Sequence, residues 1–404
     1  MQRSNLLPIV VVGGGIGGLA TALALSQKGF RVQVLEQSAE FKEIGAGIQL
    51  GPNVMRMFAI LGITEQIRRL AVFPTGLIVR DCITGEQVTC IPTGRDFEER
   101  FHYPYALIHR ADLHTGLLEC CRRCPLIELK TSQKVVEIDD RGDFVRVATE
   151  QRQQYEASAL VGADGLWSTV REMFVKDGKP RVSGHIAYRA VMPLSDFPER
   201  LRWQAMVIWC GEKTHLVHYP LRGGELFNLV AVFHSSRYEE GWDSYGDPAE
   251  LHERFAQTHP DVRGLLSKIE TWRMWVLHDR EPIKTWSFGR VTLLGDAAHP
   301  MLQYLAQGAA MAIEDAVTLA YEMEKSPDDP AAAFERYQAS RYLRTARVQI
   351  YARLYGEVYH ASGVVRELRN SILSAQTPEQ AYQGFGWLYD YSGPTSLAPA
   401  AGVD

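Results

Sequence analysis

Apolar and polar residues follow two different periods along this chain, and the changes of period predict its elements. Near the N-terminus the apolar run Ile9–Val12 leads into a cluster of glycines and then into small and apolar residues at 19–28. Gly29 ends this stretch, as glycine commonly does at the C-terminus of a helix. A second apolar run, Val32–Leu35, follows. The pattern predicts a strand, a helix and a second strand joined into one βαβ unit.

The middle of the chain is dominated by strand-like alternation. Residues 75–92 are typical of a hairpin, and residues 126–160 contain several short alternating runs. From about 182 to 285 the runs become richer in aromatic residues, and residues 202–233 predict three consecutive strands separated by turns. These segments indicate a separate antiparallel sheet.

Two later apolar runs return to the pattern of the first strand. Residues 160–162 precede the acid–glycine pair at 164–165, and residues 289–294 precede the glycine–acid pair at 295–296. Helical spacing then runs from 308 to about 380, and the last twenty or so residues are expected to form an irregular tail. Because strands of one parallel sheet would come from distant segments, we predict that the first domain is discontinuous.

The glycine cluster has the spacing Gly13, Gly15 and Gly18, which is a fingerprint of dinucleotide binding. Gly13 suits a tight turn, Gly15 lets backbone N–H groups approach a pyrophosphate, and Gly18 lets the helix pack closely on the strand. The N-terminus of that helix adds partial positive charge. Glu36 ends the second strand, where a carboxylate can accept both ribose hydroxyls. The motif predicts FAD, NAD or NADP without separating them, although the acid disfavours a 2′-phosphate.

Composition excludes several classes of function. The net charge of −5 gives no electrostatic basis for nucleic-acid binding. No apolar run approaches the roughly 18 residues of a membrane span, and the segment before the glycines is too short for a signal peptide. Cys120, Cys121 and Cys124 have no second pair and no nearby histidine, so we expect them on or just after a helix. We therefore expect a cytoplasmic protein without a bound metal ion.

Three motifs occur in a characteristic order. They are the glycines at 13–18, the string VGADGLWSTVR at 161–171 and the string GRVTLLGDAAHP at 289–300. Together they resemble the single-component, or group A, flavoprotein aromatic hydroxylases, which share the p-hydroxybenzoate hydroxylase fold. The resemblance covers nearly the whole chain.

The resemblance implies an α/β protein with a discontinuous Rossmann-like FAD-binding domain, an inserted β-sheet substrate domain and C-terminal helices. The predicted FAD-binding domain combines residues 1–74, 98–181 and 285–345. The predicted β-rich substrate domain combines residues 75–97 and 182–284, and a C-terminal helical region and tail occupies 346–404. A chain of 404 residues is long enough for this arrangement.

The resemblance also implies tightly bound FAD and assigns residues to it beyond the glycine motif and Glu36. Arg110 matches an arginine that reaches the flavin and pyrophosphate region, and Asp296 matches the aspartate that binds the ribityl chain. Asp164 matches an aspartate tied to FAD and to the nicotinamide, with a structural turn cap as the alternative. Three small residues complete the set, because a flat ring or a phosphate can approach them closely: Gly47, Gly308 and Ala309.

The sequence contains no second Rossmann unit for a nicotinamide cofactor. This agrees with the family, in which NADH or NADPH docks transiently, reduces the flavin and leaves, and the resemblance favours NADH. The resemblance further implies O2 as a co-substrate and a homodimer formed through the C-terminal helices.

Other strings narrow the expected substrate. HRADLH at 109–114, DREPI at 279–283 and LQYL at 302–305 resemble family members that hydroxylate 3-hydroxybenzoate para to its phenol. That reaction gives gentisate, in aromatic catabolism, through a flavin C4a-hydroperoxide. Salicylate 1-hydroxylation, or hydroxylation of another small aromatic acid, is the alternative within the family. A flavin-dependent reductase or oxidase that forms peroxide is the alternative from another class.

The strand expected in THLVHYP carries candidate catalytic residues. Its period of two places His215 and Tyr219 on one face and His218 on the other. The resemblance implies that His215 and Tyr219 face the substrate phenol, whose proton they can polarise or accept; a place in the core is the structural alternative for both. We expect Gln303 to hold substrate or to orient His215. Arg189 suits a carboxylate clamp, and an exposed structural arginine is equally consistent.

Overall fold

The computed structural model describes residues 7–43, 45–237 and 245–394. One layer is a six-stranded sheet in the order β17-β18-β11-β1-β2-β7, which is parallel except for the pair β17 and β18. Its strands are β1 (Ile9–Val12), β2 (Val32–Leu35), β7 (Ile127–Lys130), β11 (Ala159–Gly162), β17 (Ser287–Phe288) and β18 (Val291–Leu293). The predicted βαβ unit is confirmed, and two distant strands return to its sheet as expected.

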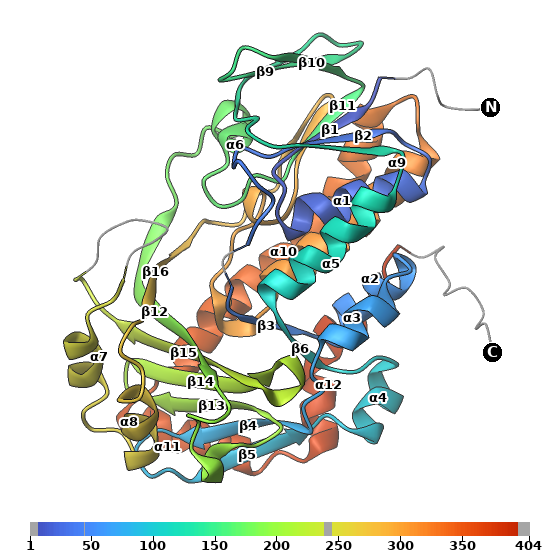
Figure 1. The fold of residues 1–404 in the computed structure, drawn as a ribbon. Coiled ribbons are helices and arrows are strands. Elements are labelled where there is room, and N and C mark those ends of the chain that lie inside the picture. The colour runs from blue at the N-terminus through green and yellow to red at the C-terminus, as the bar shows by residue number, and fades with distance from the viewer. Residues whose placement is uncertain (1–6, 44, 238–244, 395–404) are drawn as a thin grey trace.

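Helices cover one side of this sheet, and a small antiparallel sheet covers the other (Figure 1). α1 (Ile16–Gln27) packs against α5 (Arg110–Arg123) and α9 (Gly308–Lys325), and α10 (Pro330–Tyr359) packs against α9. The small sheet consists of β8 (Val135–Asp140), β9 (Val145–Thr149) and β10 (Gln154–Ala157), with α6 (Thr169–Phe174) close to β8. β1 is buried at every position and α1 at nearly all, because both consist of small and apolar residues.

A seven-stranded sheet forms the second layer, in the order β16-β12-β15-β14-β13-β4-β5. Its strands are β4 (Gly76–Asp81), β5 (Gln87–Pro92), β12 (Arg181–Pro193), β13 (Met206–Gly211), β14 (Thr214–Leu221), β15 (Leu226–His234) and β16 (Arg273–Asp279). The expected hairpin is confirmed as β4 and β5, and the three consecutive strands are confirmed as β13, β14 and β15. All neighbours are antiparallel except β13 and β4.

The two faces of this sheet pack against different partners. One face forms an apolar core with three short helices: η1 (Glu199–Leu201), α7 (Pro248–Arg254) and α8 (Pro260–Leu266). The opposite face meets α10 and η4 (Gln303–Leu305), which follows η3 (Gly295–Ala297). This second face, which we call the inner face, is the one that can supply side chains to a site shared with the parallel sheet.

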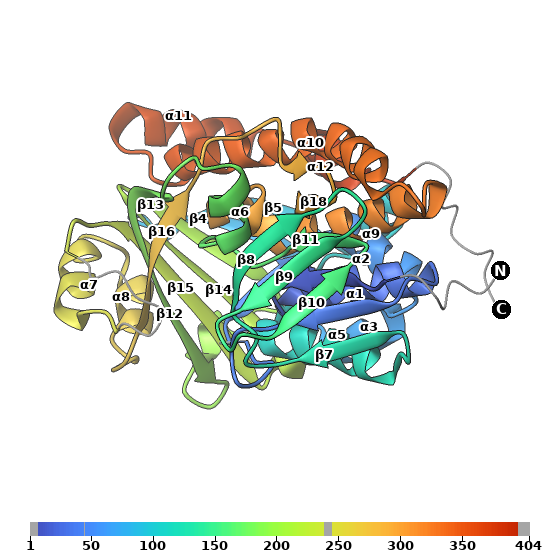
Figure 2. The ribbon, with the colours of Figure 1, turned by 90° about the horizontal axis from the view of Figure 1, so that it is seen from above.

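Short elements join the two layers. β3 (Gly47–Leu50) pairs with β6 (Ala106–His109), and η2 (Arg222–Gly224) connects β14 to β15. The remaining helices are α2 (Pro52–Ile60), α3 (Thr64–Leu70), α4 (Arg95–Phe101), α11 (Gly363–Ser374) and α12 (Pro378–Tyr389). Figure 2 shows α10, α11 and α12 along one side of both sheets.

Two expectations about the C-terminal part change. The helical region extends further than expected, because a capping box at Thr377 starts α12 and its apolar residues carry it to Tyr389. Only residues 390–394 of the expected tail are described without helix, and 395–404 lie outside the described residues. α10 also passes through residue 345 without a break, so the predicted boundary at that position lies inside a helix.

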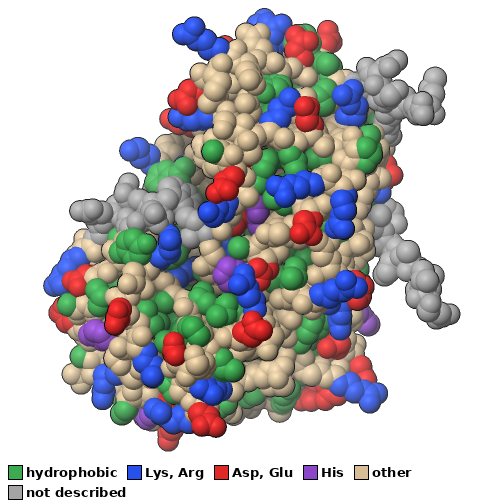
Figure 3. Space-filling view, in the orientation of Figure 1, with side chains coloured by type: hydrophobic (Ala, Val, Ile, Leu, Met, Phe, Trp, Pro, Cys, Tyr) green, Lys and Arg blue, Asp and Glu red, His purple; other side chains and the backbone are tan. Residues whose placement is uncertain are grey.

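The described surface agrees with the modest net charge. Figure 3 shows basic and acidic side chains interspersed over one face, without a large area of one sign. None of the helices among the described residues is long and apolar enough to cross a membrane. Cys120 and Cys121 lie on α5 and Cys124 directly follows it, as expected.

Candidate active site

The glycine turn between β1 and α1 is shaped for close approach. Gly13 has a φ of +104°, and a Cβ there would lie 2.4 Å from the carbonyl oxygen of Ala163. A Cβ on Gly18 would lie 1.9 Å from the carbonyl oxygen of Gly13. Gly15 is the N-cap of α1 and makes no side-chain cap, so the first N–H groups of that helix point toward the turn. This cradle fits a phosphate-bearing ligand.

Glu36 closes the turn from the end of β2. The backbone N–H of Gly14 donates to its Oε2 at 2.7 Å, and the N–H of Ser38 donates to its Oε1 at 2.8 Å. His114 Nε2 lies 2.8 Å from the carbonyl oxygen of Gly14. The carboxylate is therefore already oriented by the backbone, and each oxygen keeps a lone pair for a further donor such as a ribose hydroxyl.

The start of α9 lies beside this cradle. Ala312 on α9 would meet a Cβ added to Gly17 of α1 at 3.2 Å, and one added to Gly295 at 3.0 Å. Gly308 and Ala309 form the first turn of α9, which has no side-chain cap. Two helix N-termini thus converge on one region, and both favour negative charge there.

Asp296 is exposed although Gly295 and Ala297, its neighbours in η3, are buried. The surrounding protein raises the pKa of Asp296, and the Arg110 guanidinium opposes that rise. An exposed carboxylate that is surrounded by protein faces an opening rather than the outer surface. Asp296 is therefore placed to accept hydroxyl groups of a bound ligand.

Gly47 begins β3, and Arg110 directly follows β6 as the first residue of α5. Arg110 Nε lies 2.8 Å from Oε2 of Glu43, and both side chains keep some exposure. The N–H of Gly47 donates to Oδ1 of Asn228 at 2.8 Å. The expected cofactor residues Gly47 and Arg110 therefore lie at the same end of the β3–β6 pair, which also contacts β15 through Asn228.

Asp164 is engaged within its own segment. Its carboxylate accepts hydrogen bonds from the Ser168 hydroxyl and, at 3.2 Å, from the backbone N–H of Val170 at the start of α6. Burial raises the pKa of Asp164, and the Ser168 hydrogen bond opposes the rise. These contacts match the structural alternative of a turn cap, and they leave the proposed contact with FAD as a prediction.

His215 and Tyr219 lie on the inner face, as the strand period predicts. His215 is packed against Tyr304 and Tyr359, and Tyr219 against the segment of Gly47. His218 points to the opposite core, beside Phe197. Burial lowers the pKa of His215 to about 3, so its imidazole is neutral near pH 7 and one ring nitrogen carries a lone pair.

Gln303 contacts Arg189, so it is not the residue that orients His215. Gln303 Oε1 accepts a hydrogen bond from the Arg189 guanidinium, whereas Nδ1 of His215 is paired with His360. The orienting partner of His215 is therefore a histidine. Arg189 lies over the Trp275 ring at 5.4 Å, and its Nε has no partner within the described ranges. Burial lowers its pKa to about 10, so it remains cationic near pH 7.

Arg189 is a cation on the inner face without a carboxylate partner in the described part of the chain. Val217, which lies between His215 and Tyr219 on β14, is only half buried, as are Arg189 and Gln303. These partial exposures mark a place where the inner face is open. A small aromatic acid would find a cation and two potential phenol partners on one face there.

His299 turns into the protein rather than toward this opening. Its Nε2 lies 2.6 Å from Oδ2 of Asp315, and both side chains are buried. Asp315 also accepts from Arg341 Nε at 2.6 Å, and Arg341 pairs with Glu314. This buried ionic network ties the turn after β18 to α9 and α10.

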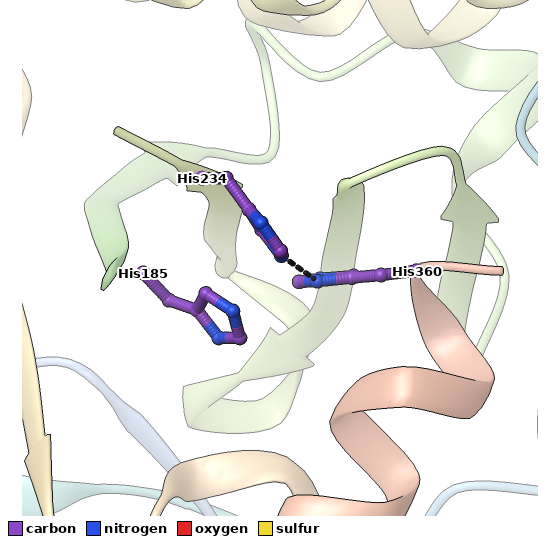
Figure 4. Close-up of side chains that lie close together, drawn as sticks. All are labelled: His185, His234 and His360. Atoms are coloured by element: carbon purple, nitrogen blue, oxygen red, sulfur yellow. Dashed lines mark hydrogen bonds between the residues drawn. The ribbon is translucent and has the colours of Figure 1, made fainter. Parts of the chain in front are cut away.

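Sequence reasoning missed His360, which completes the surroundings of His215. His360 follows α10 and lies 145 positions after His215 in the chain, so no local spacing connects them. His185 and His234 were equally overlooked, although strand parity places both on the inner face with His215. Figure 4 shows His185, His234 and His360 pointing toward a common centre.

Comparison with known proteins gives a consistent picture. The model of the FAD binding domain family matches residues 7–349. The chain is 49% identical over 392 residues to 3-hydroxybenzoate 6-hydroxylase of Polaromonas naphthalenivorans (strain CJ2), covering 97% of this chain and 98% of that protein. It is 45% identical over 388 residues to the protein of the same name from Klebsiella oxytoca, covering 96% and 98%.

Solved structures show the same architecture. Klebsiella pneumoniae HpxO complexed with FAD and uric acid has a TM-score of 0.85 at 25% identity, with 98% of this chain and 99% of that chain covered. A salicylate hydroxylase substrate complex has a TM-score of 0.82 at 26% identity, with 96% of each chain covered. These similarities span both sheets and the C-terminal helices.

Proposed function

The chain belongs to the FAD binding domain family, and from this premise we propose that it hydroxylates 3-hydroxybenzoate para to the phenol, giving gentisate with NADH and O2 as co-substrates. The observation that carries the proposal is the 45–49% identity, over nearly the whole length, to proteins named 3-hydroxybenzoate 6-hydroxylase. This similarity identifies the chain as an FAD-dependent aromatic hydroxylase. The residues of the site support the proposal that 3-hydroxybenzoate is its substrate.

The residues present fit FAD. The uncapped N-terminus of α1 after the glycine turn suits the pyrophosphate, and the oriented carboxylate of Glu36 suits the ribose. We propose that the exposed Asp296 and the first turn of α9 at Gly308 and Ala309 hold the flavin end. FAD supplies the activation of O2 and the transfer of one oxygen atom to the ring.

The inner face supplies recognition of the substrate. We propose that the Arg189 guanidinium pairs with the substrate carboxylate, since it is an interior cation with spare donors. His215 and Tyr219 then flank the phenol, and a neutral His215 can take its proton. Loss of that proton enriches the ring carbons ortho and para to the oxygen, which favours attack para to it. Enclosure by Tyr304 and Tyr359 keeps water from the reacting atoms.

Product analysis with purified protein tests the proposal. The protein should be yellow, and 3-hydroxybenzoate should accelerate NADH oxidation with one gentisate formed for each NADH consumed. 4-Hydroxybenzoate is a matched control, because it carries the same carboxyl and hydroxyl groups at different relative positions on the ring. Conversion of salicylate to catechol, with 3-hydroxybenzoate giving only peroxide, would overturn the substrate assignment.

Salicylate hydroxylation is the second candidate, since a salicylate hydroxylase substrate complex shares the fold at a TM-score of 0.82. The same panel separates the two. Parallel assays with NADH and NADPH test the nicotinamide preference, for which we propose NADH.

We also propose a homodimer formed through the C-terminal helices. Exposed apolar side chains gather on α10 and α11: Leu343, Ile350, Leu354, Val364, Val365, Leu368 and Ile372. Such a run of apolar residues on neighbouring helices favours burial against a second surface. Light scattering after size exclusion should give twice the mass of one chain, and Leu368→Glu should shift it toward a monomer.

A further inference from the structure

Four histidines gather at one end of the inner face. His185 on β12 lies directly opposite His234 on β15, and their rings stack at 4.0 Å. His215 is on β14, next to β15, and His360 follows α10. The four side chains come from four separate elements and meet beside the proposed site.

Three of these histidines form a continuous chain of hydrogen bonds. Nδ1 of His215 lies 2.8 Å from Nε2 of His360, and Nδ1 of His360 lies 3.0 Å from Nε2 of His234. Figure 4 shows the second of these contacts. Both ring nitrogens of His360 are therefore used, one toward His215 and one toward His234.

Exposure increases along this chain. The side chains of His215 and His360 are buried, with 2% and 7% of their surface accessible, whereas His234 is half buried. Near His234 lie Glu357, which is exposed, and Lys213. The order His215, His360, His234 thus leads from the interior of the proposed site toward solvent.

The imidazoles are all neutral near pH 7. Burial lowers the pKa of each, and repulsion from neighbouring histidines lowers the pKa of His215 and His360 further. A neutral imidazole has one N–H donor and one acceptor nitrogen, so it can accept a proton on one side and release one from the other. Three such rings in series can pass a proton along without any ring staying charged.

We propose that His215, His360 and His234 relay a proton between the substrate phenol and solvent. This inference rests on the proposed function, in which His215 meets the phenol. The phenol O–H breaks as Nε2 of His215 gains the proton, and Nδ1 of His215 releases its own proton to Nε2 of His360. Nδ1 of His360 then protonates Nε2 of His234, whose Nδ1 proton passes to water.

Each ring gains and loses one proton, so the chain changes tautomer and carries no net charge. After hydroxylation, the ring carbon that received oxygen loses its hydrogen as a proton, and the former phenol oxygen must regain one. The reverse transfer through the same three rings supplies it and restores the starting tautomers. One path therefore serves both proton steps of the cycle.

The same cluster has the ligand set of a three-histidine metal site, formed by His185, His234 and His360. The hydrogen bonds favour the relay. A metal ion would need the lone pair of His360 Nδ1 that faces His234 at 3.0 Å, and Nδ1 of His185 is already bonded to the Tyr304 hydroxyl. Measurement of the metal content of the purified protein tests the alternative, a metal site.

The test compares His360→Gln and His234→Ala with His185→Asn, whose ring stacks on His234 outside the chain of hydrogen bonds. Removal of His360 or His234 should lower kcat for hydroxylation about 10-fold, less than the roughly 100-fold or more contributed by a group that meets the reacting atoms directly. KM and FAD content should be unchanged, and His185→Asn should keep kcat. Because His234 is half buried, added imidazole should restore several-fold of the lost rate to His234→Ala, which a structural role would not permit.

Unchanged kcat in both relay variants, or a loss of rate in His234→Ala that imidazole does not restore, would overturn the relay. Stoichiometric zinc in the purified protein, with activity lost on its removal, would also overturn it. If His360→Gln does not fold, the His234→Ala rescue alone decides. Rates are measured with whichever phenol the wild type hydroxylates, so failure of the substrate assignment is seen in the wild type and failure of the relay only in the variants.

Discussion

Gly47 and Tyr219 are in direct contact across the boundary between the two layers. A Cβ added to Gly47 would lie 2.5 Å from a ring carbon of Tyr219 and 2.9 Å from Asn228. The N–H of Gly47 also donates to Asn228 Oδ1. The segment expected to pass near the flavin thus fixes the position of a residue expected to touch the substrate.

Gly47→Ala should therefore disturb hydroxylation through Tyr219. The added methyl group overpacks the contact and costs about 1–3 kcal/mol, so the melting temperature should fall. Less product should form for each NADH oxidised. In the double variant Gly47→Ala with Tyr219→Ala, the ring is absent. The loss of stability of this double variant should therefore be smaller than the sum of the losses of the two single variants. Strict additivity would show that the contact does not carry the effect.

His215→Ala should separate flavin reduction from hydroxylation. The variant should keep FAD and consume NADH, while gentisate formation falls about 100-fold and peroxide rises, because the proton acceptor at the phenol is lost. Product by chromatography and peroxide by a coupled assay measure the two outcomes.

His218 provides the control on the same strand. It is buried on the opposite face beside Phe197, so His218→Ala should lower stability yet keep the ratio of product to NADH for each bound FAD. A normal ratio of product to NADH in His215→Ala would mean that His215 is a core residue rather than a catalytic one.

The parts of the site that rest on local rules could be predicted. Gly13 and Gly18 are required by a turn within ten residues, and the faces of His215 and His218 follow from the period of one strand. Both predictions are confirmed in position and orientation. The contact of each residue with a ligand stays a prediction.

The parts that depend on long-range packing could not be predicted. His360 meets His215 only because α10 ends beside β14, and no spacing in the sequence records that. Gln303 was expected to hold substrate or to orient His215; the chain after β18 places it against Arg189, and a contact with substrate stays a prediction. Among the described residues, the lack of a carboxylate beside Arg189 depends on how β12, β16 and η4 pack together, so only the folded chain reveals it.

Arg189→Met should weaken binding of the aromatic acid while keeping the shape of the site. Loss of a hydrogen bond between charged groups costs about 1.5–3 kcal/mol, so KM for 3-hydroxybenzoate should rise about 10- to 150-fold. Arg189→Lys keeps the charge without the bidentate fork, so its KM should lie between the values of wild type and Arg189→Met. 3-Hydroxybenzyl alcohol lacks the carboxylate, and its KM should be equal in wild type and variant. An equal rise for the alcohol would assign Arg189 a structural role.

Acid stability tests the buried network around Asp315. Burial raises the pKa of this carboxyl, but His299 and Arg341 outweigh burial and hold it at about 2, below its ordinary 3.8. Because the folded state holds the proton less tightly than the unfolded state, the contribution is complete above about pH 4 and is lost as pH falls toward 2. The difference of nearly two units corresponds to about 2 kcal/mol. Asp315→Asn should therefore be less stable than wild type in urea at pH 6, with the gap closing between pH 4 and pH 2. A gap that stays constant over that range would mean that Asp315 acts through packing rather than through its charge.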